Sequence, residues 1–305
     1  MSVTTRWVDT TENTLDGILE KFLESTEDTL YEDKISYINI QVQKKFDNNI
    51  FFEFKNRRIE YNVIEYTYDS ISPGEGQIED RKTSSSGLVI VYSNSGKVNY
   101  IINKNSNALT ELRWLIGYKG KLEIEKNESN INSELLIWII SRLLREENEL
   151  SISSYNNEEE VFLILNSIVG FKGKTDDQIS FVTADGDSIL NILSTLSFLL
   201  ESKLLQQIKL RLQFDVHDNI ELTLKDTKTI DANINKYDGP FDDHTKFKKI
   251  AEIYLLIYLE IMPMLYLKYQ QDVDNESWGT VQKKEFLTSV RDKLIENINQ
   301  KVSSM

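Results

Sequence analysis

Cysteine is absent from this chain of 305 residues. Its absence excludes disulfide bonds, iron–sulfur clusters, thiolate zinc sites and cysteine nucleophiles. Histidine is nearly absent, and with only His217 and His244 the chain cannot build a multi-histidine metal site or a histidine acid–base pair. We interpret His217 as an exposed turn residue between two strands and His244 as part of a helix-capping loop. The sequence therefore predicts no metal site.

The motifs that hold phosphates, dinucleotides or a serine nucleophile are also missing. No G-x-x-x-x-G-K-[ST], no G-x-G-x-x-G after a strand and no G-x-S-x-G occurs. Acidic residues followed by lysine, as in residues 31–34 (YEDK) and 122–126 (LEIEK), fit a nuclease core only loosely, because any chain rich in glutamate and lysine contains such strings. The sequence thus predicts no cofactor and identifies no catalytic residue, and it favours a protein that is not an enzyme.

Positive charge is in short supply, with 35 Lys and Arg against 49 Asp and Glu and a formal net charge of −14. Such a chain repels nucleic acid on average, so a polyanion site must be a local basic patch. The N-terminus has no basic region followed by an apolar one, as a secretory signal would. The most apolar stretch, residues 250–267, contains Glu252, Glu260 and Pro263, which favours a buried helix over a membrane span. We expect a cytoplasmic protein with no membrane partner.

Residues 1–104 predict an antiparallel β-rich domain with an N-terminal helix. Residues 14–25 place apolar side chains at three-and-four spacing, and the runs after Lys34 are short and rich in Ile, Tyr, Phe and Val. Residues 69–87 contain Pro73, two glycines and clustered serines, and they predict a long loop that is either a functional lid or disordered. Two further strands follow, joined by the Asn-Ser-Gly of a tight hairpin.

Residues 105–305 predict an α+β domain whose middle contains an internal duplication. The string "GYKGK" begins at Gly117 and "GFKGK" begins at Gly170. When the two glycines are aligned, residues 105–150 and 158–202 both read as helix, turn, strand and helix. The sequence therefore predicts a duplicated helix–turn–strand–helix unit, packed as a pseudo-symmetric pair.

A hairpin and two long helices are predicted for the C-terminal part of this domain. Pro263 should kink or end the first helix, because it lacks an amide donor and clashes with the preceding turn. The last helix repeats apolar residues at nearly every fourth position: Val281, Phe286, Val290, Leu294, Ile298 and Val302. This narrow stripe could contact a second copy of the chain or a partner protein, and it is equally suited to packing inside the molecule.

The two glycine–lysine turns are the candidate binding site, although helix capping explains part of them. A helix that ends in glycine followed by an apolar residue predicts a Schellman cap, which accounts for Gly117 and Tyr118 and, in the second copy, for Gly170 and Phe171. Capping does not require the second glycine and lysine, which would let a phosphate approach the backbone between two ammonium groups. The predicted anion or nucleic-acid site consists of Tyr118, Lys119, Gly120, Lys121, Lys172, Gly173 and Lys174.

These features predict a non-enzymatic intracellular bacterial binding protein that recognises nucleic acid or a nucleotide through the paired turns. The usage of Asn, Ile and Lys suggests an AT-rich bacterial genome, and hence an accessory system such as phage defence. One alternative is a metal-dependent, nuclease-like enzyme that uses scattered carboxylates near residues 69–87. The other is an acidic scaffold or inhibitor that acts by its negative surface, as a nucleic-acid mimic does.

Overall fold

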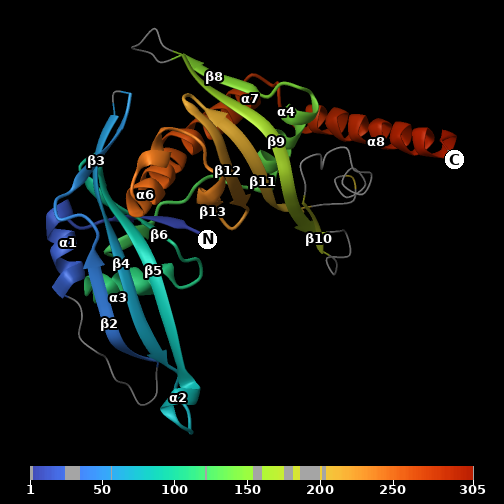
Figure 1. The fold of residues 1–305 in the computed structure, drawn as a ribbon. Coiled ribbons are helices and arrows are strands. Elements are labelled where there is room, and N and C mark those ends of the chain that lie inside the picture. The colour runs from blue at the N-terminus through green and yellow to red at the C-terminus, as the bar shows by residue number, and fades with distance from the viewer. Residues whose placement is uncertain are drawn as a thin grey trace. The chain divides into compact units, whose positions relative to one another are not determined.

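The computed structural model describes residues 3–24, 35–55, 57–120, 122–153, 160–174, 181–185, 200 and 204–304, without the side chains of 152–153 and 181–185. The chain forms two compact units (Figure 1). The N-terminal unit comprises Ser2–Glu128 with Thr245–Tyr254, and the C-terminal unit comprises Ser129–His244 with Leu255–Met305. Each unit contains one antiparallel sheet, so the predicted α+β class is confirmed.

The sheet of the N-terminal unit has seven strands in the order β2-β4-β5-β6-β1-β7, and β3 pairs with the first part of the long β4. All its pairings are antiparallel, and β1 from the start of the chain lies between β6 and β7. The strands are β1 (Thr5–Asp9), β2 (Ser36–Lys44), β3 (Ile50–Phe54), β4 (Arg57–Ile71), β5 (Lys82–Asn94), β6 (Lys97–Ile102) and β7 (Ile124–Lys126).

Helices α1 (Leu15–Glu24) and α3 (Ala108–Ile116) cover one face of this sheet (Figure 1). Their inward side chains, such as Leu15, Ile18 and Phe22 of α1, join strand residues such as Val91 in one hydrophobic core. The three-and-four spacing in α1 produces this arrangement, because it places the apolar residues on one side of the helix. The predicted N-terminal helix and antiparallel sheet are confirmed.

The predicted long loop at residues 69–87 is wrong in its extent, because only residues 72–77 lie outside the strands and the short helix of this segment. β4 continues to Ile71 and β5 begins at Lys82, with the short helix α2 (Ile78–Arg81) near the tip of this long hairpin. Asp69 holds the hairpin and the neighbouring β2 together, because it accepts hydrogen bonds from Asn39 (2.7 Å) and Ser84 (2.5 Å) and pairs with Lys82. These hydrogen bonds hold the pKa of Asp69 well below its usual range.

The sheet of the C-terminal unit has six strands in the order β10-β9-β11-β12-β13, and β8 pairs with β9. Helix α4 (Ser133–Leu144) packs on β9 and β11. The β11–β12 hairpin agrees with the predicted C-terminal hairpin. The strands are β8 (Glu149–Ser153), β9 (Glu160–Lys174), β10 (Phe181–Asp185), β11 (Leu204–Phe214), β12 (His217–Lys225) and β13 (Thr229–Ala232), and the 3-10 turns η2 (Ile234–Lys236) and η3 (Pro240–Asp243) follow.

The predicted duplication fails at its second copy. Residues 158–169 were expected to form a helix that ends at Gly170, but residues 160–174 form the continuous strand β9, whereas the first copy is a helix that ends at Gly117. In the first part of β9, the buried residues Leu163 and Leu165 alternate with residues that are not buried. Ile168 and Val169 are then buried in succession, where the register with β11 shifts. These irregularities give the apolar residues a spacing that resembles a helix. The second helix of that copy, residues 187–200, lies almost entirely outside the described residues.

The predicted long helix after residue 245 is confirmed, and Pro263 is accommodated without ending it. Helix α6 (Lys246–Leu256) continues through the π-helical turn η4 (Ile257–Ile261) into α7 (Met262–Asp274). Proline lacks the amide donor and its ring crowds the preceding turn. The π-turn accommodates both effects, because it widens the helix just before Pro263. By length and composition this helix could cross a membrane, but 72% of its apolar window is buried inside the structure, as expected for a core helix.

The apolar stripe of α8 (Thr280–Ser303) does not pack as a single seam. Phe286 and Val290 are buried, whereas Val281 and Val302 are 64% and 66% exposed. A step of four residues turns a helix about 40° beyond a full turn, so the stripe rotates by about 160° between Phe286 and Val302. The stripe therefore faces the core only at Phe286 and Val290, and contact with a second copy or partner protein stays a prediction.

Candidate functional site

The first glycine–lysine turn follows α3, and its glycine caps the helix as predicted. Gly117 has a left-handed backbone, with φ 76° and ψ 21°. The amide of Tyr118 donates to the carbonyl of Arg113 (2.8 Å), and the amide of Gly117 donates to that of Trp114 (3.1 Å). These are the two hydrogen bonds of a Schellman motif, so the conformation of this turn follows from ending a helix.

A carboxylate of the chain itself occupies the place where a phosphate was expected to approach this turn. The amide of Gly120 donates to Oε1 of Glu123 (2.6 Å), and a side chain at Gly120 would collide with the same carboxylate. Glycine therefore lets Glu123 approach the backbone in this position. Lys119 is exposed, and Lys121 lies outside the described residues.

Hydrogen bonds hold Tyr118 against β1 and against the loop that precedes α1. Its hydroxyl donates to Oδ2 of Asp9 (2.7 Å) and lies 3.1 Å from Nδ2 of Asn13. Burial, with the hydrogen bond to Asp9, raises the pKa of Tyr118 to about 12. The ammonium group of Lys21 lies 4.9 Å from the centre of its ring. Tyr118 thus serves the packing of the N-terminal unit, and its predicted stacking role has no support in this geometry.

The second set of predicted residues lies in the C-terminal unit, in the middle of a sheet. Lys172, Gly173 and Lys174 are the last three residues of β9 and pair with both β10 and β11. Gly173 is buried with Phe171, whereas Lys172 and Lys174 alternate with them and are partly exposed. The two lysines therefore lie on the polar face of the sheet, while Phe171 belongs to the core instead of a helix cap.

Further basic residues share this polar face with Lys172 and Lys174. Gln207 of β11 lies opposite Lys172 on one side and Lys225 of β12 on the other. Lys209 and Arg211 follow Gln207 on the same face, because the residues between them are buried. We call this surface the cationic sheet face and define it by Lys172, Lys174, Lys209, Arg211, Lys225 and the adjoining Lys236 of η2.

A buried glutamate organises one end of the cationic sheet face. Glu221 of β12 lies opposite Arg211, and its side chain is 0% exposed. Its Oε1 lies 3.2 Å from Nζ of Lys209, and its Oε2 lies 3.0 Å from Nζ of Lys236. Burial acts to raise the pKa of Glu221, but hydrogen bonds, chiefly from Asn233, Lys236 and Lys209, outweigh it and lower the pKa to about 2. Glu221 is therefore ionised at neutral pH and unsuited to acid–base catalysis there.

Sequence reasoning missed the cationic residues of β11 and β12, although a signal for them was present. In the predicted hairpin, Lys209 and Arg211 alternate with leucine or isoleucine, as do Glu221 and Lys225. Period-two alternation places charged residues of paired strands on one face. A charge count for each predicted face, instead of for each turn, would have identified the surface.

His217 is buried, so its interpretation as an exposed turn residue was wrong. It is 2% exposed, and its Nδ1 lies 2.6 Å from the hydroxyl of Tyr237. The same hydroxyl also accepts the amide hydrogen of Phe241 (3.2 Å), so it links His217 to η3. Burial lowers the pKa of His217 to about 4, although Asp215 and Asp218 act to raise it.

The buried His217 predicts a loss of stability in mild acid. Between about pH 6.5 and 4 the unfolded chain binds a proton at this residue and the folded chain does not, so the free energy of unfolding falls as the pH falls, by at most about 3 kcal/mol. Urea unfolding at a series of pH values measures this. His217→Gln should lose less stability than the wild type across this window, and equal losses would contradict the assignment.

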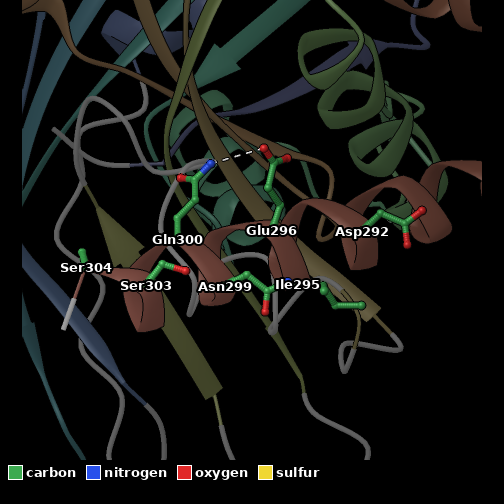
Figure 2. Close-up of a pocket in the computed structure, with 7 residues that line it drawn as sticks. All are labelled: Asp292, Ile295, Glu296, Asn299, Gln300, Ser303 and Ser304. Atoms are coloured by element: carbon green, nitrogen blue, oxygen red, sulfur yellow. Dashed lines mark hydrogen bonds between the residues drawn. The ribbon is translucent and has the colours of Figure 1, made fainter.

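A hollow of 680 Å³ lies along the C-terminal half of α8 (Figure 2). The described residues that line it include two carboxylates, Asp292 and Glu296, and Gln300 donates to Glu296 (3.2 Å). Among the described residues of the chain, no three His, Asp or Glu side chains are grouped so as to hold a metal ion.

Comparison of the chain with models of known protein families and with curated proteins gives no match.

Proposed function

We propose that the protein is a non-enzymatic binding protein that recognises nucleic acid through the cationic sheet face. The observation that carries the proposal is local charge. Among the described residues, six basic residues on this face stand against three nearby carboxylates, Glu221, Asp226 and Asp231, in a chain whose net charge is −14. A local positive surface attracts the phosphate backbone, whereas the acidic remainder of the protein repels it.

The spacing of the lysines suits an extended backbone. Lys172 and Lys225 lie in one row across β9, β11 and β12, which places them about 10 Å apart along the surface. Among the described aromatic side chains of this sheet, Phe171 and Phe214 are buried on the opposite face, whereas Phe162, near the start of β9, is 38% exposed. The recognition that we propose rests on phosphate contacts, so affinity should depend strongly on salt and little on sequence.

Binding of single-stranded 20-mers of DNA and RNA, measured by fluorescence anisotropy across a salt series, tests the proposal. The triple variant Lys172→Ala, Lys174→Ala and Lys225→Ala should bind about 10- to 100-fold more weakly near 100 mM salt. Its slope of log K against log salt should be smaller by about 2, because three phosphate contacts are removed.

A matched triple variant of the N-terminal unit controls for the loss of net charge. Lys55, Lys97 and Lys119 are exposed, and their change to alanine removes the same three charges. This control also tests the first glycine–lysine turn, through Lys119. It should bind as the wild type does. Equal affinity of the wild type and the sheet variant would refute the proposed function.

A further inference from the structure

The cluster around Glu221 gathers more positive charge than its buried carboxylate can neutralise. Oε1 of Glu221 accepts from Lys209 and from Nδ2 of Asn233 (2.8 Å), and Oε2 accepts from Lys236 and from Nε of Arg211 (3.3 Å). A carboxylate accepts about four hydrogen bonds, so these donors saturate it. Three cationic groups are thereby fixed around one point.

The charge of the cluster can be counted from its immediate neighbours. Asp231 of β13 lies beside Lys209 and Lys225, which act to lower its pKa while burial raises it. Among the described residues, the cluster holds Lys209, Arg211, Lys225 and Lys236 against Glu221 and Asp231, which gives these six side chains a charge of about +2 at neutral pH. Glu221 is 0% exposed whereas Lys236 is 48% exposed, so the cationic groups lie between the glutamate and solvent.

This charge and its geometry fit a phosphate dianion better than a phosphodiester. A phosphomonoester carries −1.5 to −2 at neutral pH and presents three acceptor oxygens, whereas a phosphodiester carries −1. Each lysine ammonium group has three donors, of which Glu221 uses one, so donors remain for a ligand. The fixed carboxylate also holds the lysines in place before the ligand arrives, which lowers the entropic cost of binding.

We infer that the Glu221 cluster binds a phosphate dianion, the group carried by a phosphorylated end of an oligonucleotide. The inference rests on the proposed function, because the rest of the cationic sheet face would hold the adjoining phosphodiesters. Glu221 is then a positioning residue, and Lys209, Arg211 and Lys236 contact the phosphate.

Paired oligonucleotides that differ only at one end test the inference. Anisotropy is measured with an oligothymidine 15-mer that carries a 5′-phosphate or a 5′-hydroxyl, and with a second pair that differs at the 3′ end. One phosphorylated end should be bound about tenfold more tightly than its hydroxyl counterpart at pH 7.5. The preference should shrink below about pH 6, where the phosphate becomes a monoanion, and inorganic phosphate should compete with it.

Variants at exposed positions keep the test independent of folding. Lys236→Ala should reduce the preference to less than about twofold while binding of the hydroxyl oligonucleotide changes little. Lys284→Ala, an exposed lysine of α8 in the same unit, should leave the preference intact. Measurable binding without preference for either phosphorylated end, or an unchanged preference in Lys236→Ala, would overturn the inference and leave the proposed function standing. Failure to bind any oligonucleotide would refute both.

Discussion

Replacement of Glu111 by alanine should lower the free energy of unfolding by about 3–5 kcal/mol. Glu111 of α3 is 7% exposed and accepts hydrogen bonds from the hydroxyls of Tyr66 (2.6 Å) and Tyr68 (2.9 Å). Lys104 lies 3.4 Å from the same carboxylate. Alanine would leave two buried hydroxyls and a partly buried ammonium group without their acceptor, and the cost of these unsatisfied groups exceeds the value of any one bond. Urea unfolding followed by circular dichroism measures the loss.

Two further variants separate hydrogen bonding from simple loss of volume. Glu111→Gln keeps the size and one acceptor oxygen, so it should cost about half as much as alanine. In the background of Tyr68→Phe, the cost of Glu111→Ala should fall by about 1 kcal/mol or more, because one of the stranded donors has been removed. Additive losses in this cycle would show that the carboxylate is not the shared acceptor on which the network depends.

Gly87→Ala should cost about 3–4 kcal/mol, although glycine in a strand is normally replaced by alanine at little cost. A methyl group at Gly87 would overlap the ring and hydroxyl of Tyr66, which lies directly across the ladder on β4. Tyr66 cannot move aside freely, because it is 1% exposed, stacks near Tyr68 and is hydrogen-bonded to Glu111. The strain should appear as a lower urea midpoint with an unchanged slope.

The neighbouring Ser86 supplies the control for Gly87. It is exposed on the same strand, so Ser86→Ala should change stability by less than about 0.5 kcal/mol. In a Tyr66→Leu background the additional cost of Gly87→Ala should largely vanish, since the ring that it meets is gone. If Gly87→Ala still lowers stability in the Tyr66→Leu background, the loss arises from the backbone conformation and not from the contact with the ring.

Predictions based on contacts within one turn of helix succeeded, as at Gly117. A Schellman cap uses hydrogen bonds between residues three and five apart, so the segment that ends α3 contains all its partners. The hydrophobic face of α1 could likewise be predicted from the sequence. The spacing of Leu15, Ile18 and Phe22 places them on one side of the helix, whatever the helix packs against.

Predictions failed where distant partners decide the structure. β9 carries a glycine and a helix-like apolar spacing, and only its pairing with β11, whose bulges shift the alternation, makes it a strand. The serines before Gly87 look like a loop by composition, yet their partners on β4 complete a ladder. The surroundings of Lys172 could not be predicted for the same reason, because its neighbours come from β11 and β12 rather than from a repeated turn.

The π-turn before Pro263 also sets the angular phase of everything that follows it in the helix. Each residue advances a helix by about 100°, so the one extra residue in such a turn decides which side of α7 faces α4. In the observed phase, Asp272 accepts from Nε1 of Trp138 (2.8 Å) and lies 3.2 Å from Arg142. A chain one residue shorter within Ile257–Ile261 would turn Asp272 about a quarter of the circumference away and bring Val273 toward the tryptophan. Proline and the π-turn thus together determine which side chains of α7 face α4 in the C-terminal unit.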